Sequence, residues 1–531
     1  MRRPLILTSA GVLALSAAVL IPAAATSDSA HSHTAATTPS CSTLPVPAPS
    51  GARVDSIQVI ADPGGTKTFP DQTVTDVPAY CDVTVVLSHP GAGDRVTVKV
   101  MLPSNPGDWT GRLQALGGSA YQAGDLNGSG LAAGVKNGYV TTTTDAGVSQ
   151  NLIDASWGLK PDGTVNTGLL KNFASRSAHD MTVVAKNVAR AYYGRSVGYA
   201  YWNGCSTGGR QGYQEAQSYP NDYDGILAAA PAVDWSRFAI GTLWSQAVFN
   251  EERVAPTTCE MAAFNTAAIK ACDNLDGVAD GIIDTPRNCH WDPRSLIGTK
   301  VQCEGQELTI SAALADAVRK IWAGPTSPNG RQLWYGPNVG ADFAYLATAG
   351  NPFIVADNWA KYFVAKDPAF DTKKLTYASF YQLFTQSVRE YDRVIGTNDA
   401  DLSAFRDAGG KLLSWHGQAD QLVPTKGTVG YRNRVNLVMG GNARVDDFYR
   451  LFLLPGVQHC GGGTGLQAVD PLGTLVNWVE KGQRPATLVT ATTSSTGEVT
   501  ATRNACSYPQ VARYVGHGDP NQATSYRCAI K

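Results

Sequence analysis

The chain has 531 residues and a mass of 56.1 kDa, and its 43 Lys and Arg residues nearly balance 44 Asp and Glu residues, so the formal net charge is −1. Hydrophobic residues make up 43% of the sequence, enough for a large packed core, which excludes a mainly disordered chain. The balanced charge argues against a nucleic-acid-binding or polybasic membrane-binding protein, because both need a basic patch.

The first 25 residues have the three-part layout of a secretory signal peptide. Two arginines precede an apolar run from Pro4 to Ile21, and small residues follow at 22–25. A transmembrane anchor is the alternative, but the run contains hydroxyl residues and no cationic flank follows it. We therefore predict that residues 1–25 are removed and that the protein is secreted. Ten cysteines agree with an oxidising compartment, and residues 26–40 are expected to form a flexible lead-in.

The next part of the chain alternates between strands and helices. Apolar residues at helical spacing predict an amphipathic helix over Ala178–Tyr193, and a second helical stretch covers Gln211–Ser218. Strand, turn and helix in this order are typical of a parallel sheet with crossover helices. Runs of β-branched residues predict strands at Val83–Leu87, Arg95–Leu102, Tyr139–Thr142 and Gly198–Trp202.

The pattern changes between about residues 234 and 398, where four cysteines, many aromatic residues and several Pro and Gly breaks occur. We interpret residues 235–400 as a lid domain inserted into the sheet domain. The α/β pattern resumes with strands at Gly410–His416 and Phe448–Leu454 and a helix around Val469–Lys481. Residues 41–234 and 401–531 are therefore predicted to form one domain.

A G-x-S-x-G motif at Gly204–Gly208 lies between a predicted strand and a predicted helix. This context is that of a nucleophile elbow, a tight turn that exposes the hydroxyl of Ser206 above the sheet. The N–H of Thr207, at the start of the helix, would then face a developing oxyanion. An ordinary glycine-rich turn is the alternative.

Two later loops hold the partners that a serine nucleophile needs. Asp420 follows the strand Gly410–His416, where it would hold an imidazole in the right tautomer, although it could also cap a turn. His459 follows the next strand and would be the general base, although a lone loop histidine is often only polar surface. The order Ser, Asp, His, with each residue after a strand, is that of an α/β hydrolase.

Two cysteines strengthen this prediction. Cys205 directly precedes Ser206, and Cys460 directly follows His459. If the serine and the histidine are within hydrogen-bonding reach, their neighbours are close enough for a disulfide, which needs Cα atoms about 5.5 Å apart. Two unrelated buried thiols are the alternative.

This Cys-Ser, Asp and His-Cys arrangement resembles the tannase and feruloyl esterase family, which includes mono(hydroxyethyl) terephthalate hydrolases, over nearly the whole mature chain. The resemblance implies an α/β-hydrolase fold with a large inserted lid, with Ser206 as nucleophile, Asp420 as acid and His459 as base. The family's first oxyanion donor lies in a glycine-rich loop that matches Gly117-Gly118, where Gly118 is the expected donor beside Thr207.

The insertion also contains an acidic, glycine-containing run from Cys272 to Ile282. Oxygen ligands suit Ca²⁺, but composition alone leaves a solvated acidic loop as an equal alternative. The family resemblance favours the metal, because the lid of that family binds calcium through this pattern. By that analogy, a structural Ca²⁺ is held by the side chains of Asp273, Asp276 and Asp280 and the carbonyl groups of Val278 and Ile282.

The resemblance also suggests how the remaining eight cysteines pair, which the residues alone leave open among 105 connectivities. By analogy the pairs are Cys272 with Cys289, Cys506 with Cys528, Cys41 with Cys81, and Cys259 with Cys303.

We therefore expect a secreted carboxylic ester hydrolase that acts through an acyl-enzyme on feruloyl, galloyl or related benzoate-type esters. The substrate would be a small aromatic ester or a plant-polymer ester, with no nucleic-acid partner and no membrane contact after signal cleavage. The aromatic residues of the insertion suggest a flat acyl group in an apolar cleft, although they could equally form the core of the insertion. A secreted serine peptidase or acyltransferase with the same triad, or a binding protein with an inert hydrolase fold, are the alternatives.

Overall fold

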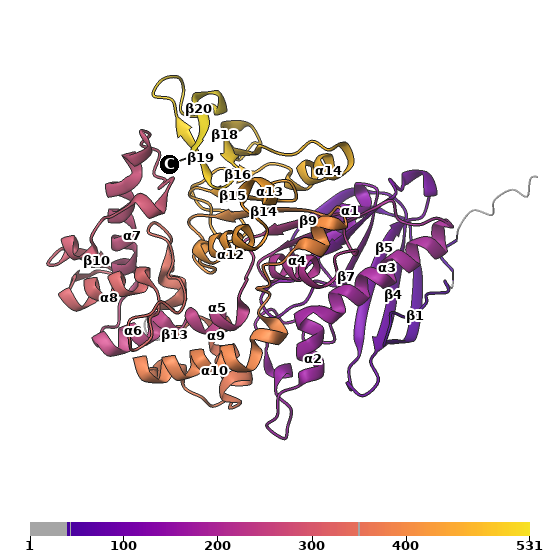
Figure 1. Ribbon diagram of the computed structural model, residues 1–531, viewed down its shortest axis with the longest axis horizontal. Helices are drawn as coiled ribbons and strands as arrows, with labels where there is room; N and C mark the ends of the chain where they lie inside the picture. The colour runs from indigo at the N-terminus through magenta and orange to yellow at the C-terminus, as the bar shows by residue number, and fades with distance from the viewer. Residues whose placement is uncertain (1–39, 43, 349–350, 531) are drawn as a thin grey trace, which may run out of the picture. The chain divides into compact units, whose positions relative to one another are not determined.

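The computed structural model describes residues 40–42, 44–348 and 351–530 (Figure 1). The predicted signal peptide, residues 1–25, and all but the last residue of the predicted lead-in, residues 26–40, lie outside the described residues. The described residues all belong to one compact unit, Pro39–Lys531. No helix among them is long and apolar enough to cross a membrane.

A nine-stranded sheet forms the centre of the described chain. The pairs β1–β4, β4–β5 and β5–β7 are antiparallel, and every later pair is parallel. This mixed sheet agrees with the predicted α/β architecture. In spatial order its strands are β1 (Arg53–Asp62), β4 (Tyr80–Ser88), β5 (Val96–Pro103), β7 (Tyr139–Thr144), β6 (Arg112–Leu116), β8 (Tyr199–Cys205), β9 (Gly225–Ala229), β14 (Lys411–Gly417) and β15 (Tyr449–Leu454).

The strands predicted from β-branched runs are confirmed, within a few residues at their ends, as β4, β5, β7, β8, β14 and β15. The sequence reading missed β1, β6 and β9. Short strands such as Arg112–Leu116 and Gly225–Ala229 are too brief for periodicity to separate them from other apolar segments.

Helices cover both faces of the sheet. Successive side chains of β8 point to opposite faces and pack against different helices. Ala200 and Trp202 pack with α3 and α4 on one face, while Tyr201 packs with α14 on the other. α1 packs against β5 and β7 on the same face as α14. The main helices are α1 (Gly130–Lys136), α3 (Ser177–Tyr193), α4 (Thr207–Ser218), α12 (Thr425–Val438) and α14 (Pro471–Lys481).

The predicted helix Ala178–Tyr193 is confirmed as α3, but α4 begins at Thr207, four residues before the predicted start. Glycines at this end argue against a helix by propensity alone. They are needed because the helix packs closely on the sheet: a Cβ on Gly209 would lie 2.3 Å from the Ala229 carbonyl oxygen.

The segment predicted as an insertion is mostly helical, and Figure 1 shows its helices beside the β14–β15 end of the sheet, on the far side from β1. Its two ends meet: Trp235 N–H donates to the Gly396 carbonyl at 3.2 Å, and Asn398 donates to Asp234 at 2.9 Å. Its main helices are α5 (Trp235–Gly241), α6 (Trp244–Glu252), α7 (Thr258–Cys272), α8 (Ala312–Ala323), α9 (Ile354–Trp359) and α10 (Tyr377–Ile395).

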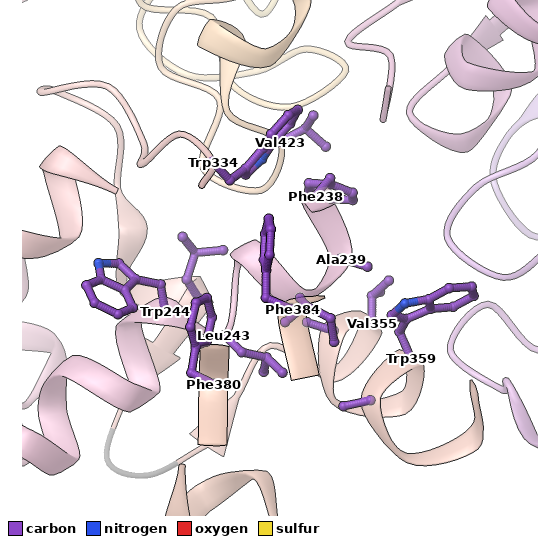
Figure 2. Packing of buried hydrophobic residues seen from close by; sticks show 14 of the residues in the cluster. Phe238, Ala239, Leu243, Trp244, Trp334, Val355, Trp359, Phe380, Phe384 and Val423 are labelled. Atoms are coloured by element: carbon purple, nitrogen blue, oxygen red, sulfur yellow. The ribbon is translucent and has the colours of Figure 1, made fainter. Parts of the chain in front are cut away.

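The aromatic residues of this segment pack mainly against one another (Figure 2). Trp359 has no exposed surface, stacks on Phe363 with ring centroids 4.3 Å apart, and donates to Ser387 at 2.9 Å. Trp244 stacks on Tyr377 at 4.9 Å. Most of these rings therefore form the core of the insertion, so their number is no evidence for an aromatic substrate.

The remaining elements are short. The C-terminal region forms a small sheet and a hairpin, β16 (Gln467–Ala468), β17 (Thr487–Thr493), β18 (Val499–Cys506), β19 (Gln510–Tyr514) and β20 (Tyr526–Ile530). The others are β2 (Gly65–Thr68), β3 (Thr73–Val77), β10 (Lys300–Cys303), β11 (Gln306–Thr309), β12 (Ala347–Thr348), β13 (Asn351–Pro352), α2 (Thr167–Lys171), α11 (Ser403–Asp407) and α13 (Asn442–Val445).

All five predicted disulfide pairings are confirmed. The pairs are Cys41–Cys81, Cys205–Cys460, Cys259–Cys303, Cys272–Cys289 and Cys506–Cys528.

Candidate active site

The parallel register brings the three predicted triad residues to one edge of the sheet. Cys205 pairs with Ala229, Ala229 with Trp415, and Trp415 with Phe452, so these residues form one row across β8, β9, β14 and β15. Ser206 comes directly after this row, Asp420 five residues after Trp415, and His459 seven residues after Phe452. Because carboxyl ends of parallel strands share an edge, the loops that carry these residues start side by side.

Ser206 occupies the predicted sharp turn between β8 and α4. Its φ of 62° and ψ of −119° are a strained conformation for a residue with a side chain, as a nucleophile elbow requires. The turn is held by its N–H, which donates to the Ala229 carbonyl at 3.0 Å. A Cβ on Gly204 would lie 2.5 Å from the Gly208 carbonyl carbon, so position 204 must be glycine.

Thr207 is the first residue of α4, where a helix has no internal acceptor for its N–H groups. Its hydroxyl donates to the Ala120 carbonyl at 2.7 Å and so ties the start of the helix to the loop after β6. Thr207 therefore begins the helix directly after Ser206, at the position where the sequence predicts an oxyanion donor.

Gly118 is placed differently from the prediction. Its N–H donates to the side-chain oxygen of Gln211 at 2.9 Å in a buried contact, and its carbonyl accepts from Gly208 N–H at 2.9 Å. Gln211 also donates to the Ala123 carbonyl at 2.9 Å. The expected role of Gly118 as an oxyanion donor is therefore corrected: its N–H anchors the loop to α4, and the sequence did not reveal Gln211 as the acceptor.

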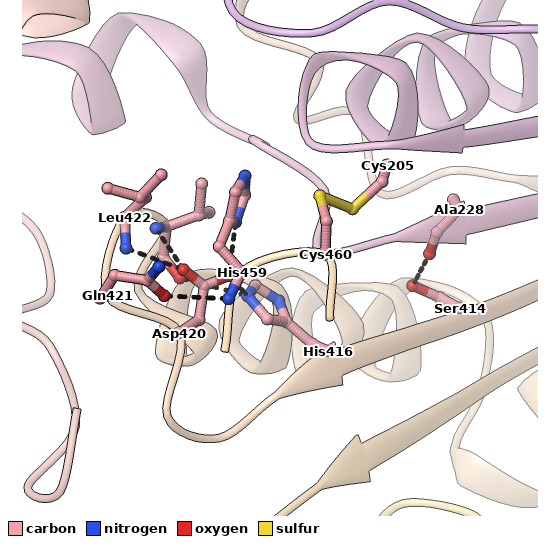
Figure 3. Close-up of a disulfide and its surroundings, with 10 residues drawn as sticks. Cys205, Ala228, Ser414, His416, Asp420, Gln421, Leu422, His459 and Cys460 are labelled. Carbon is pink, nitrogen blue, oxygen red and sulfur yellow. Dashed lines mark hydrogen bonds and ion pairs between the residues drawn. A yellow bond between two sulfur atoms is a disulfide. The ribbon is translucent and has the colours of Figure 1, made fainter. Parts of the chain in front are cut away.

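Asp420 is almost fully buried, and four donors surround its carboxylate. One oxygen accepts from the N–H groups of Leu422 and Val423, both at 2.8 Å. The other accepts from His459 Nδ1 at 2.8 Å and faces His416 Nε2 at 2.9 Å (Figure 3). Burial alone would raise the pKa of Asp420, but the neighbouring His459 and the hydrogen bonds from both histidines hold it well below its usual value.

His459 lies in the loop after β15, with its side chain 12% exposed. Its backbone N–H donates to Gln421 at 2.9 Å, which fixes the loop beside Asp420. Because Nδ1 faces the carboxylate, the proton resides on that nitrogen and Nε2 keeps the lone pair that a general base needs.

The disulfide between Cys205 and Cys460 joins the serine and histidine loops (Figure 3). The two Cα atoms are 5.9 Å apart, and the bridge spans 255 positions of the sequence. A covalent link thus connects the residue before Ser206 to the residue after His459, as the sequence predicted. The imidazole of His459 and the carboxylate of Asp420 thus meet from two distant segments, and the bridge ties the Ser206 turn to the loop that carries the imidazole.

His416 is the residue of this site that the sequence reading missed. It is fully buried at the end of β14, with Nε2 beside Asp420 and Nδ1 2.8 Å from the Thr428 hydroxyl. The sequence places His416 four residues before Asp420, which could have indicated a contact, but the strand pattern alone gives this histidine no role in the site.

The acidic run in the insertion forms a closed turn. Asp273 Oδ1 accepts from the N–H groups of residues 280, 281 and 282 at 3.0, 2.9 and 3.2 Å. Asp276 accepts from Val278 N–H at 3.0 Å. Asp280 accepts from Ile282 N–H at 3.1 Å and from the Arg503 guanidinium at 2.8 Å.

The oxygen atoms of this turn are of the kind that Ca²⁺ prefers, but the side chains are not arranged around a common point. Burial, with the negative charges of Asp284 and Asp280, raises the pKa of Asp276 to about 6. The described residues contain no group of three or more His, Cys, Asp or Glu side chains placed to hold a metal ion. The expected carbonyl ligands, Val278 and Ile282, belong to the same turn.

Comparisons with known proteins extend these observations. The family model described as tannase and feruloyl esterase matches residues 81–529. The chain is 44% identical over 527 residues to a protein described as a probable feruloyl esterase from Arthroderma benhamiae, covering 96% of this chain and 97% of the relative. It is 28% identical over 528 residues to the mono(2-hydroxyethyl) terephthalate hydrolase of Piscinibacter sakaiensis, covering 85% of each chain.

Among solved structures, the tannin acyl hydrolase from Aspergillus niger superposes with a TM-score of 0.82 at 25% identity, covering 92% of this chain and 93% of the other. This similarity confirms the α/β-hydrolase fold predicted from the sequence.

Proposed function

Because the chain belongs to the tannase and feruloyl esterase family and is a carboxylic ester hydrolase, we propose that it cleaves esters of aromatic acids through an acyl-enzyme on Ser206. The observation that carries this proposal is the pair formed by Asp420 and His459 at 2.8 Å, linked to the Ser206 turn by the Cys205–Cys460 bridge. A nucleophile, a base and an oriented carboxylate are the parts that acyl transfer needs.

The proposed reaction has two steps. His459 Nε2 takes the proton of the Ser206 hydroxyl as the oxygen attacks the ester carbonyl, and the Thr207 N–H stabilises the oxyanion. The alcohol leaves with the proton from His459, and the acyl group remains on Ser206. Water, activated by the same imidazole, then releases the acid. Asp420 stabilises the imidazolium in both steps.

The substrate class in this proposal rests on the relatives. One is described as a probable feruloyl esterase, and one solved structure as a tannin acyl hydrolase. We therefore propose hydroxycinnamoyl, galloyl or related benzoate-type esters, as small molecules or attached to plant polymers. The aromatic rings of the insertion are not part of this argument, because most of them pack against one another.

A substrate panel tests the proposal. Purified enzyme should hydrolyse methyl ferulate, methyl gallate or a mono-ester of terephthalate, and Ser206→Ala should abolish this activity. Ser218→Ala, at an exposed position on the same helix, is the matched control and should keep full activity. A Ser206→Ala enzyme with more than a tenth of the parent rate would overturn the assignment.

A serine peptidase or acyltransferase would use the same triad, so substrates must separate these functions from ester hydrolysis. The esterase proposal expects release of acid from methyl ferulate and no cleavage of a peptide anilide. Cleavage of the anilide as the faster reaction would favour the peptidase, and transfer of the acyl group to an added alcohol in preference to water would favour the acyltransferase.

Secretion is also part of the proposal. Its support is the signal-peptide pattern of residues 1–25 together with five disulfides, which persist in oxidising compartments. Expression with the native N-terminus should place enzyme lacking residues 1–25 in the culture medium, where mass spectrometry of the N-terminal peptide identifies the cleavage site.

We also propose that the turn from Asp273 to Ile282 holds a structural Ca²⁺, with the side chains of Asp273, Asp276 and Asp280 and the carbonyl groups of Val278 and Ile282 as ligands. Its support is the family resemblance and the presence of three aspartates in one closed turn. Elemental analysis should find one Ca²⁺ per chain, and a chelator should lower the melting temperature. Protein that contains no calcium and melts unchanged would rule out the ion.

A further inference from the structure

A second imidazole shares the carboxylate that orients the proposed base. His416 has no exposed side-chain surface, and its Nε2 lies 2.9 Å from Asp420 Oδ2 and 3.1 Å from the Val423 carbonyl oxygen. Asp420 Oδ2 is also the oxygen that accepts from His459 Nδ1 (Figure 3). A histidine at the end of β14 and one in the loop after β15 therefore meet at one oxygen atom.

The partners of His416 determine where its proton lies. Nε2 faces a carboxylate oxygen and a carbonyl oxygen, and both can only accept, so Nε2 carries a hydrogen. Nδ1 faces the Thr428 hydroxyl at 2.8 Å, which can donate to it. A neutral ring with hydrogen on Nε2 satisfies every contact, and Thr428 stabilises that tautomer from α12.

The other oxygen of Asp420 is held by two backbone N–H groups, so the carboxylate has donors on both sides. Among the described residues, the titratable groups that face Asp420 are His416 at the end of β14 and His459 after β15. No lysine or arginine pairs with it there. In the part of the chain that the structure describes, His416 is therefore the only donor to Oδ2 besides the proposed base.

We propose that His416 is a positioning residue: it donates a fixed hydrogen bond to Asp420, aims Oδ2 at His459, and moderates the pull of the carboxylate on the proton of His459. This inference rests on the proposed function, because it takes Asp420 and His459 as members of the triad. This role affects the pH range in which the enzyme is active. Without the hydrogen bond from His416, the less-screened carboxylate binds the imidazolium of His459 more strongly, so the base becomes available only at higher pH.

Two substitutions test this role. His416→Leu removes the donor, whereas His416→Gln keeps an amide N–H that can reach the carboxylate. For His416→Leu we expect about a tenfold lower kcat, little change in KM, and an acid limb of kcat/KM that moves to higher pH by about half a unit to one unit. His416→Gln should retain most of the rate and shift the limb less. A purely structural role would lower the melting temperature of both variants without moving the pH profile.

A measurement on the unmodified enzyme keeps the proposal testable if these variants fail to fold. In protein labelled with ¹⁵N-histidine, the His416 ring should carry its hydrogen on Nε2 and none on Nδ1. Thr428→Val, which removes the hydroxyl but keeps the shape, should weaken that preference, and Thr428→Ser should restore it. A His416 ring that carries hydrogen on Nδ1 would overturn the proposal.

The outcomes also separate this inference from the proposed function. A fully active Ser206→Ala enzyme would refute the triad and this inference with it. If Ser206→Ala is inactive while His416→Leu keeps the parent kcat and pH profile, the triad stands and the role of His416 is refuted.

Discussion

The parallel sheet and the insertion use their buried side chains in different ways. In the sheet, the register places Cys205, Trp415 and Phe452 in one row. The side chains of the proposed triad follow in the loops at this edge of the sheet. In the insertion, rings such as Trp359 and Phe363 are buried against each other. Substitutions at the sheet edge should therefore change chemistry, whereas substitutions inside the insertion should change stability.

The largest expected effect is the loss of activity when residues at the edge of the sheet are replaced. Replacing Ser206, Asp420 or His459 by Ala should lower kcat by at least about a thousandfold, because each removes the nucleophile, the orienting group or the base. Melting temperatures should change little for Ser206→Ala and His459→Ala, whose side chains are partly exposed, and more for Asp420→Ala, which leaves buried donors without an acceptor. Steady-state hydrolysis of methyl ferulate or methyl gallate measures the first quantity, and calorimetry measures the second.

The insertion should show the opposite behaviour. Trp359→Ala removes a fully buried ring that stacks on Phe363 and donates to Ser387, so we expect a loss of about 3–5 kcal/mol in unfolding free energy. The kcat of the folded fraction should remain within about twofold of the parent. Val394→Ala, at a 41% exposed position of α10, is the control and should have little effect on either quantity. A large fall in kcat for folded Trp359→Ala would show that the insertion core shapes the active site.

Two disulfides provide a sharper contrast, because each belongs to one region. Removing Cys205–Cys460 by double Ala substitution should reduce activity and stability together, with a stability loss of about 2–4 kcal/mol. Removing Cys272–Cys289 in the insertion should lower stability to a similar extent but leave kcat near the parent value. Unchanged kinetics and melting for the first variant would mean that the bridge does not hold the two loops together.

The smallest effect concerns a buried acid on the far part of α4. Burial, reinforced by the charge of Asp222, raises the pKa of Glu215 well above its usual value. The folded protein therefore binds this proton more tightly than the unfolded chain, so stability is lost as pH rises above about 4.5 towards the raised pKa. Glu215→Gln should remove this loss and gain about 1 kcal/mol or more at neutral pH, with no gain near pH 4.

Thermal unfolding between pH 4 and 8 measures this difference, with the exposed Glu498→Gln as control. Lys186 and Asp180 also face the Glu215 carboxyl group, so their charges contribute to the same titration. Parallel curves for the parent and Glu215→Gln would show that the buried carboxyl group does not titrate differently on folding.

Local sequence patterns predicted the elements of the sheet more accurately than the role of the residues in the insertion. β-branched runs located β4, β5 and β7, because such residues favour extended chains. Apolar periodicity placed the helical stretch at Gln211–Ser218 and left out the Gly-rich first turn of α4, since close packing of Gly209 on β9 overrides its low helix propensity, whereas the G-x-S-x-G motif put the helix start at Thr207. In the insertion, the aromatic residues suggested a substrate cleft, but aromatic content alone does not reveal which way a ring faces, and the rings proved to be core.

The amino-acid sequence by itself determined the order Ser206, Asp420, His459, the cysteines next to the first and last of them, and the strands that precede each loop. Those features are local, because they depend on residue type and spacing along the chain. Only the tertiary structure decided that Gln211 binds the N–H of Gly118, 93 positions away, and that His416 shares Asp420 with His459. Such partners are chosen by which buried polar groups the packed elements bring together, and spacing along the chain does not encode that choice.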